Sequence, residues 1–385
     1  MTPVDEFTEI RALAARVARD VYGPLADQMD LDRTPVSREQ RKRLGDLGFL
    51  GIAHPERFGG SEAPLAQALA VIEEFGMVCR PAAFQIFEAN TGPAQVITHL
   101  ATEEQRERWL PDIISGERTM AVAISEPDAG SAATDMRTSA KLTEDGYIIN
   151  GTKRWISNGG EADQYLVYCR LNDEPGAQGI GAIVVDRGTP GFTFGAGERL
   201  MGFRGIPSAD LYFDNVQVPA SDVVVPAGDF GKLFGVFSIE RLGNTSMSIA
   251  IGQAALDKTL KYVEQREQFG KPLVEFQSVQ VILADMVLLV EAARLLRDRA
   301  AAGVRSGELP NSLHVSLAKC TANEMAKRVT DLAMQLHGGN GYTEEYGIER
   351  LHRDSHGWAI AGGTPTIQRM RIVSEMLGRR FDQRA

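Results

Sequence analysis

The spacing of apolar residues after about residue 229 limits the possible folds more than any other feature of this chain. It predicts three long helices: one from about Leu233 to Gln268, one from about Val274 to Arg305, and one that ends before Gly338-Gly339. The first should stop at Gly270-Lys271-Pro272, because glycine and proline both oppose continuation of a helix. Helices this long bury their apolar faces by packing side by side, so residues 229–385 are predicted to form a four-helix-bundle-like α domain.

Two regions with different sequence patterns precede the predicted bundle. Residues 1–118 are dominated by Ala, Leu and Glu, which predicts an N-terminal α-helical domain. In residues 119–228, short apolar runs alternate with Gly, Asp and Asn turns, which is typical of an antiparallel β domain, and Asp145-Gly146 predicts a hairpin within it. The expected fold class is therefore α+β, with three domains at 1–118, 119–228 and 229–385.

Composition narrows the function classes. The chain has 51 acidic and 41 basic residues and a net charge of -10, which argues against a nucleic-acid partner, because gripping a phosphate backbone requires a basic surface. The most apolar stretch, from Val279 to Leu296, is too short and too charged to span a bilayer, and the N-terminal residues show no secretory signal. The three cysteines form no CxxC pair. We therefore expect a soluble cytoplasmic protein with no membrane association and no disulfide framework.

Two clusters in the β region could bind a flat ligand. Ser125 to Ser131 follows the predicted strand Met120 to Ile124, and its hydroxyls and glycine-freed amides could hydrogen-bond a planar, acceptor-rich molecule. In Trp155-Ile156-Ser157, the indole could lie against a heteroaromatic ring with Ser157 at the ring edge. The alternatives are an ordinary turn for the first cluster, and a core tryptophan at a strand end for the second.

Two further clusters lie in the helical region. Arg266 to Leu273, with Gln277 after it, offers a planar guanidinium that suits a pyrophosphate. Gln335 to Tyr342 is a predicted helix end whose glycines would let a ligand approach the backbone. The alternative for the first of these is a helix C-terminus whose cations complement the helix dipole.

Together and in this order, the four clusters resemble the signatures of the acyl-CoA dehydrogenase family, and the resemblance covers nearly the whole chain. The matching segments are Ala121 to Ser131, the Trp155 segment, Arg266 to Leu273 and the closing motif Gly363 to Arg369. The resemblance implies the fold of that family and an FAD-dependent oxidoreductase that converts an acyl-CoA to the 2,3-enoyl-CoA.

The resemblance also assigns the cofactor residues in two groups. One group would bind FAD from the β domain and the closing motif: Ile124, Ser125, Gly130, Ser131, Trp155, Ile156, Ser157, Thr364 and Thr366. The other would meet the ADP portion of an FAD bound mainly by a neighbouring subunit: Arg266, Gln268, Phe269, Gln277, Gln335, Gly338 and Gly339. A cofactor that bridges two chains implies an oligomer, and the family is usually a homotetramer built as a dimer of dimers.

The catalytic base is expected to be Glu240. Many relatives carry it just before the closing Gly-Thr, but here that position is Gly362, which cannot be a base. A second group of relatives places the base early in the first long helix of the bundle, where this chain has Glu240. By resemblance, Glu240 would take the α-proton while the β-hydrogen leaves as hydride to the flavin. An exposed first-turn acid is the alternative for Glu240, and Glu88 is the second candidate for the base.

Other residues are expected to meet the substrate. By resemblance, the backbone N–H of Gly362 would hydrogen-bond the thioester carbonyl and stabilise the developing enolate. Ser131 would contact the pantetheine arm, although the aspartate that usually follows it is Ala132 here. Glu88 matches a position that lines the acyl pocket, and Arg241 is also expected to bind the substrate.

Other patterns in the chain do not support a metalloprotein or a nicotinamide-dependent enzyme. His352 and His356 lack a third ligand cluster, so no metal site is expected, and no GxGxxG follows a strand, so a nicotinamide-binding domain is not supported. The expected partners are an acyl-CoA or acyl-carrier-protein thioester and an electron-transfer flavoprotein or similar acceptor. The alternatives are a dehydrogenase of an acyl or aminoacyl group tethered to a carrier protein in a biosynthetic pathway, a flavin oxidase or monooxygenase, and a DNA-associated member of the superfamily, which the acidic charge disfavours.

Overall fold

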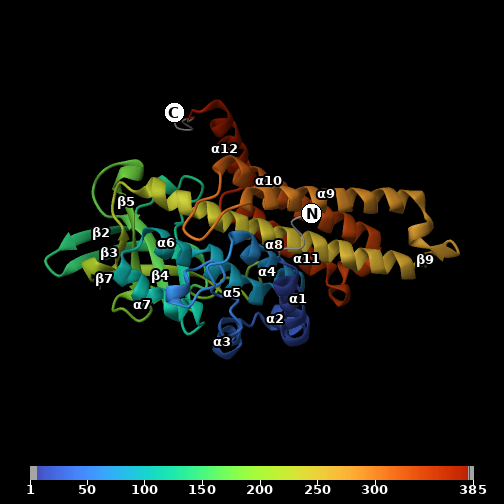
Figure 1. Cartoon of the computed structure of the whole chain (residues 1–385), viewed down its shortest axis with the longest axis horizontal. Helices are drawn as coiled ribbons and strands as arrows, with labels where there is room; N and C mark the ends of the chain where they lie inside the picture. Colours follow the sequence, from blue (N-terminus) through green and yellow to red (C-terminus); the bar gives the residue numbers. More distant parts are fainter. Residues whose placement is uncertain (1–6, 380, 382–385) are drawn as a thin grey trace.

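The computed structural model describes residues 7–379 and 381 and begins with a helical region. The helices of this N-terminal region pack against one side of the long C-terminal helices (Figure 1). Two of its helices begin with a capping box, in which Ser37 or Thr102 accepts a hydrogen bond from the amide of the glutamine three residues later. The helices are α1 Thr8–Val17, α2 Gly23–Asp32, α3 Arg38–Asp46, α4 Leu65–Val78, α5 Arg80–Thr91, α6 Pro93–Leu100 and α7 Glu103–Ile114.

The middle region forms an eight-stranded sheet in the order β6-β7-β3-β2-β4-β5-β8, with β1 paired to β4. The strands are β1 Met120–Ala123, β2 Ser139–Thr143, β3 Gly146–Ser157, β4 Gln164–Arg170, β5 Ile180–Asp186, β6 Phe192–Phe194, β7 Ser208–Val218 and β8 Val223–Val225. The predicted hairpin is confirmed, because Thr143 pairs with Gly146 across a two-residue turn. The sheet is mostly antiparallel, but β1 and β2 run parallel to β4. The chain reverses direction twice before β4, once in the β2–β3 hairpin and once between β3 and β4.

The C-terminal region is built on three long helices, α8 Phe230–Gln265, α9 Gln277–Ala301 and α10 Ser312–His337, followed by α11 Ile348–Ile360 and α12 Pro365–Leu377. All three long helices that the apolar spacing predicts are therefore present. The middle of α8 is buried on nearly all sides, because α4, α5, α9, α10 and α11 all pack against it. Polar side chains in that stretch must therefore find partners inside the protein.

The predicted end of the first long helix is wrong by three residues. The helix stops at Gln265 rather than Gln268, and the chain then forms a short hairpin of β9 Glu267–Gln268 and β10 Lys271–Pro272. Phe269 and Gly270, at the tip, have φ of 53° and 78°, as a two-residue hairpin turn requires. The sequence pattern did not predict this hairpin, which projects from the end of the molecule opposite the β2–β3 hairpin (Figure 1).

The sheet separates two apolar cores. Along β4, Tyr165 and Val167 face a core confined to the β region, whereas Leu166 and Tyr168 face the large core shared with the helices. This period of two is the alternation expected of a strand buried on both faces. It also places the Tyr168 side chain beside the first third of α8, where it lines a cavity with Val236, Phe237 and Glu240. Within the described ranges, no helix is both long and apolar enough to cross a membrane.

Candidate active site

Buried carboxyl groups in this protein fall into two kinds. Within residues 7–379 and 381, the buried acids other than Glu88 and Glu240 each form an ion pair with an arginine or a lysine. These pairs are Asp30–Arg353, Glu73–Arg297, Glu74–Arg11, Glu126–Lys153, Asp222–Arg108 and Asp354–Arg80. A buried carboxyl without a cation is costly, so Glu88 and Glu240 are the two positions where a functional requirement outweighs stability.

Glu240 lies on the buried stretch of α8, so the alternative of an exposed first-turn acid is wrong. Its side chain is 8% exposed, and its Oε2 atom is enclosed without a hydrogen-bond partner. Burial raises the pKa of the Glu240 carboxyl to about 7, although the cations of Arg241 and Lys319 partly oppose this. A carboxyl with this pKa can exchange a proton near neutral pH, which is the requirement for a general base.

The loop from Ala361 to Gly363 lies against the Glu240 carboxyl. Its three carbonyl oxygens are all held by side chains: Asn244 Nδ2 donates to Ala361 at 3.3 Å and Arg241 Nε to Gly362 at 3.2 Å. The Gly363 carbonyl accepts from both Lys319 Nζ at 3.1 Å and Gln368 Nε2 at 3.0 Å. The N–H groups of Gly362 and Gly363 donate to no other group in the described part of the chain. The loop therefore presents fixed, unused donors beside a carboxyl, which is a suitable arrangement for a substrate carbonyl.

Gly362 leaves the space that the Glu240 carboxyl occupies. A Cβ at this position would lie 3.1 Å from Glu240 Oε2 and 3.3 Å from Lys319 Cε, and the backbone φ is +70°. A side chain at position 362 and the Glu240 carboxyl would therefore compete for the same space, and the carboxyl would have to shift to admit even a methyl group.

The Gly362→Ala variant should therefore lose roughly 10- to 100-fold in the rate of substrate oxidation, because the added methyl displaces the Glu240 carboxyl. Gly378→Ala is the matched control, since Gly378 has φ +62° and no atom within 4 Å of a built Cβ. Both glycines have a positive φ that disfavours a Cβ, so comparing the single-turnover rates of the two variants separates the steric effect from backbone strain. Equal rates would show that the close approach does not matter for turnover.

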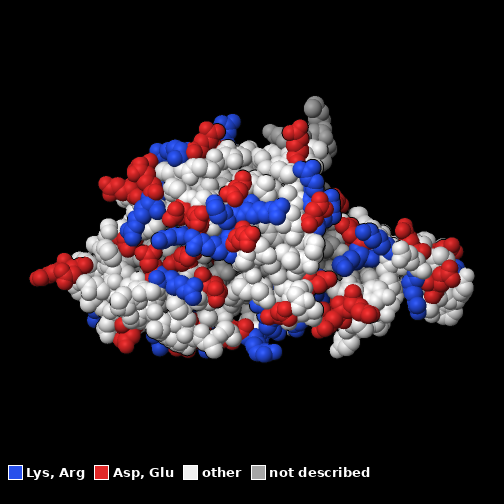
Figure 2. Space-filling model, turned by 90° about the horizontal axis from the view of Figure 1, so that it is seen from below, with Lys and Arg blue, Asp and Glu red and all other residues white. Residues whose placement is uncertain are grey.

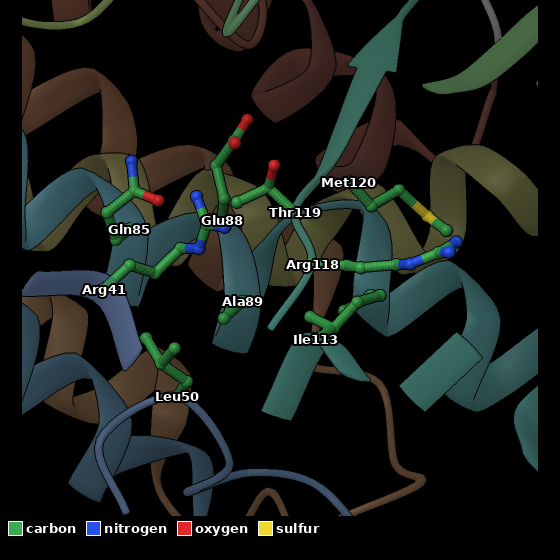
Figure 3. A pocket seen from close by; sticks show the side chains of 10 residues that line it. Arg41, Leu50, Gln85, Glu88, Ala89, Ile113, Arg118, Thr119 and Met120 are labelled. Atoms are coloured by element: carbon green, nitrogen blue, oxygen red, sulfur yellow. The ribbon is translucent and has the colours of Figure 1, made fainter. Parts of the chain in front are cut away.

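Glu88, on α5, is held from the β region. Asn158 Nδ2 donates to Glu88 Oε2 at 2.5 Å, and burial raises the pKa of the Glu88 carboxyl well above its usual value, with Glu240 adding to the effect. The side chain lines a cavity between α5, α7 and β1, and its carboxyl group points away from Leu50 and Ile113 on the other side (Figure 3). Asn158 directly follows Ser157, so Glu88 is tied to a predicted cofactor segment.

A second, apolar cavity adjoins Glu240. Its lining residues come from α5, α6, β1, β4 and α8: Thr91, Gly92, Pro93, Val96, Val122, Tyr168, Val236, Phe237 and Glu240. The wall is almost free of charge apart from the Glu240 carboxyl. A small apolar acyl group suits such a lining, because it gains from leaving water without stranding a polar group.

The two predicted clusters of the β region meet beside the sheet. The Arg154 amide donates to the Ser125 carbonyl at 2.9 Å, which joins the end of β1 to the end of β3. Trp155 sits at a bulge with φ 56° and is 52% exposed, so the alternative of a core tryptophan is wrong. The hydroxyls of Ser125 and Ser157 form no hydrogen bond within the described chain. Free hydroxyls beside an exposed indole fit an isoalloxazine ring, which needs edge donors and a flat surface.

An ion pair that the sequence did not reveal holds this segment. Lys153 is fully buried, and its Nζ donates to Glu126 Oε1 at 2.9 Å and to the Ile124 carbonyl at 2.8 Å. Glu126 also accepts from the amides of Arg137 and Thr138. Burial opposes ionisation of Glu126, but Lys153 and the amide donors outweigh it, so the pKa of the Glu126 carboxyl lies below its usual value. Glu126 and Ala129 also bridge, so the predicted turn is present.

The second group of predicted cofactor residues lies elsewhere. Arg266, Gln268, Phe269, Gln277, Gln335, Gly338 and Gly339 are all exposed. They gather where α8 and α10 end, because the Tyr262 hydroxyl donates to the His337 carbonyl at 3.2 Å and the two rings stack. Figure 1 places this end of the bundle far from the β region. Within one chain, the structure does not bring the two groups together.

The remaining predicted residues have clear positions. Thr364 caps α12 by accepting from the Ile367 amide, and Thr366 follows it on an exposed face. Gly130 and Ser131 are exposed in the turn after β1. His352 and His356 lie with their ring centroids 5.0 Å apart on α11, and no group of three or more metal-ligand side chains occurs in the described ranges. Cys79, Cys169 and Cys320 are buried and unbridged.

Sequence reasoning missed Lys319, Asn323, Asn158 and Lys153. The first two had a detectable signal, because a lysine and an asparagine four residues apart interrupt the apolar face of a long predicted helix. Lys153 and Asn158 flank the Trp155 motif but resemble ordinary strand and turn residues.

Comparisons with known proteins match the whole of this architecture. The models of the acyl-CoA dehydrogenase N-terminal, middle and C-terminal domains match residues 4–117, 121–216 and 233–377. The chain is 37% identical to a cyclohex-1-ene-1-carbonyl-CoA dehydrogenase of Geobacter metallireducens, over 94% of this chain and 97% of the relative. It is 35% identical to a 3-(aryl)acrylate reductase of Clostridium sporogenes, over 96% and 99%. The structure of a butyryl-CoA dehydrogenase from Megasphaera elsdenii superimposes with a TM-score of 0.93 at 32% identity, covering 98% of this chain and 99% of that one.

Proposed function

This chain belongs to the acyl-CoA dehydrogenase family, and from that premise we propose that Glu240 is the base with which it removes two hydrogens from an acyl thioester. The protein is an FAD-dependent oxidoreductase that acts on the CH–CH group of acyl thioesters. When bound, FAD supplies the acceptor for the hydride that leaves the β-carbon. The observation that carries the proposal is the unpaired, buried Glu240 carboxyl beside the free N–H of Gly362.

Different residues of the chain would bind the thioester carbonyl, accept the α-proton and hold the acyl group. The thioester carbonyl accepts a hydrogen bond from the Gly362 N–H, which stabilises the enolate that forms as the α-proton departs. The Glu240 carboxylate takes that proton through one of its oxygens. The apolar cavity lined by Val96, Val122 and Phe237 holds the acyl group and excludes water, which keeps the carboxylate reactive.

The cofactor site is proposed to be shared between two chains. Ser125, Trp155 and Ser157 would hold the flavin ring on one subunit. The exposed group around Arg266 and Gln335, at the far end of the bundle, would hold the ADP portion of the neighbour's cofactor. The separation of these two groups within one chain supports this arrangement, and we propose a homotetramer built as a dimer of dimers.

Two features of the partners are also proposed. The electrons would pass to an electron-transfer flavoprotein or a similar acceptor, and the thioester would be that of CoA. The alternative of a carrier-protein thioester calls for a basic surface at the mouth of the pocket, because carrier proteins are acidic. The face in Figure 2 carries Lys and Arg interspersed with Asp and Glu, so it does not offer a continuous basic patch.

The test is anaerobic mixing of the purified yellow protein with a panel of short, branched, long and cyclic acyl-CoAs. We expect at least one to bleach the flavin absorption, and the best one to identify the acyl group. Rapid reoxidation by air, in the absence of an acceptor protein, would instead identify an oxidase. Bound FAD that no acyl-CoA bleaches would shift the proposal to carrier-protein thioesters, and a protein without flavin would refute it.

A further inference from the structure

A buried lysine lies directly behind the proposed base. Lys319, on α10, has an exposed fraction of 0%, and its Cε lies 3.3 Å from the Cβ position of Gly362, the point that Glu240 Oε2 approaches to 3.1 Å. The lysine, the glycine loop and the Glu240 carboxyl therefore share one small volume. In the described part of the chain Lys319 forms no ion pair within 4 Å, and its Nζ donates instead to Asn323 Oδ1 and to the Gly363 carbonyl.

Lys319 is anchored from behind by an amide network. Its Nζ donates to Asn323 Oδ1 at 2.8 Å, and Asn323 Nδ2 donates to Asn244 Oδ1 at 2.9 Å and to Ser248 Oγ at 2.8 Å. Asn244 in turn donates to the Trp358 carbonyl at 3.0 Å. The network ties α8, α10 and α11 together, so the position of the lysine nitrogen is fixed by three helices rather than by its own flexible stem.

From this geometry we propose that Lys319 is a positioning residue for the dehydrogenation: its Nζ holds the Gly363 carbonyl, and its charge favours the ionised form of Glu240. The inference rests on the proposed function of Glu240. The clamp aims the Gly362 N–H at the substrate carbonyl, and the charge favours the carboxylate that must accept the α-proton. One side chain would thereby serve both the donor and the base.

The charged groups around Glu240 determine whether removing the Lys319 charge raises or lowers the pKa of the Glu240 carboxyl. The groups that face Glu240 are Glu88 from α5, Tyr168 from β4, Arg241 from α8 and Lys319 from α10, while Arg371 of α12 faces Arg241. Burial raises the pKa of Glu240, and the cations of Arg241 and Lys319 lower it. Burial also lowers the pKa of the Lys319 ammonium, which Glu240 partly restores. Removing the lysine charge therefore favours protonated Glu240 and a base that is inactive at neutral pH.

The experiment compares Lys319→Met and Lys319→Gln with the parent holoenzyme. Glutamine keeps an N–H donor, one bond shorter in reach than the lysine nitrogen, whereas methionine has none, and neither carries charge. We expect the low-pH limb of the single-turnover rate profile to move upward by about one pH unit in both, which lowers the rate at pH 7 about fivefold, because the parent carboxyl has a pKa of about 7. The rate at the high-pH plateau should stay near the parent value in Lys319→Gln and fall in Lys319→Met. Lys327→Met, two turns further along α10 and partly exposed, is the control and should match the parent.

An independent readout separates this inference from the assignment of the base. Infrared difference spectra between each protein and its Glu240→Gln version isolate the carboxylic acid band of Glu240, and its loss with rising pH gives the pKa directly without turnover. The midpoint should be higher in both lysine variants. An unchanged midpoint in either folded variant would overturn the role of the charge. If Glu240→Gln were fully active while the midpoint moved, the proposed base would be wrong but the electrostatic link would stand.

Discussion

The Glu240→Gln variant should reduce flavin bleaching by a good acyl-thioester substrate by about 10²- to 10⁴-fold, the range in which a positioned general base contributes to a rate. Glutamine matches glutamate in shape, but its amide cannot accept the α-proton. Because the glutamine side chain is neutral and fits the same buried space, the fold and the bound flavin should be retained. The measurement is the anaerobic single-turnover rate, with the flavin spectrum as the check on cofactor content.

Glu88→Gln is the matched control for this prediction. It also replaces a buried, unpaired carboxyl, but one that lies on α5 and is hydrogen-bonded to Asn158. If Glu240→Gln bleached as fast as the parent and Glu88→Gln did not, Glu88 would be the base.

The parent should also lose activity as the pH falls through about 7, because the base must be ionised and burial raises the pKa of Glu240 to about 7.

The Lys153→Met variant should be destabilised by about 3–5 kcal/mol, the cost of removing one partner of a buried ion pair. The substitution leaves the Glu126 carboxylate buried without its cation and frees the Ile124 carbonyl. Both groups belong to the segment that carries Ser125, so the variant should also lose FAD more readily. Chemical denaturation measures the first effect, and flavin fluorescence released on gentle warming measures the second.

Lys141→Met, on the exposed face of β2, is the control, since it removes the same charge without touching a buried carboxyl. It should unfold at the parent's denaturant midpoint and retain its flavin. A Lys153→Met protein of parental stability would mean that Glu126 takes up a proton without cost. In that case the turn after β1 would be held by the amides of Arg137 and Thr138 alone.

Local patterns in the chain were sufficient for much of the architecture. The apolar period after residue 229 predicted three long helices, and each occurs with its ends shifted by a few residues. The Asp145-Gly146 step predicted the β2–β3 hairpin. Such features depend on neighbours within a few positions along the chain, so the sequence records them directly. The β9–β10 hairpin was not predicted, because its strands have only two residues each, too few to show a periodic pattern.

Only part of the candidate active site could be predicted from the sequence. The glycine at 362 and the glutamate at 240 could be compared with a family pattern, which makes Glu240 the expected base. That the Glu240 carboxyl occupies the space a side chain at 362 would need is a fact of packing between α8 and the Ala361–Gly363 loop. Periodicity shows that a residue is buried but not which distant residue it meets.

By itself, therefore, the sequence determined the order of helices and strands, the family and the chemical type of the candidate residues. The tertiary structure decided which of them act together. It placed Lys319 behind Glu240, paired Lys153 with Glu126 and held Glu88 with Asn158. It also placed the exposed residues around Arg266 and Gln335 at the end of the bundle far from the β region. The physical reason is that a buried charge is tolerated or costly according to its three-dimensional neighbours, and those neighbours come from segments that only folding brings together.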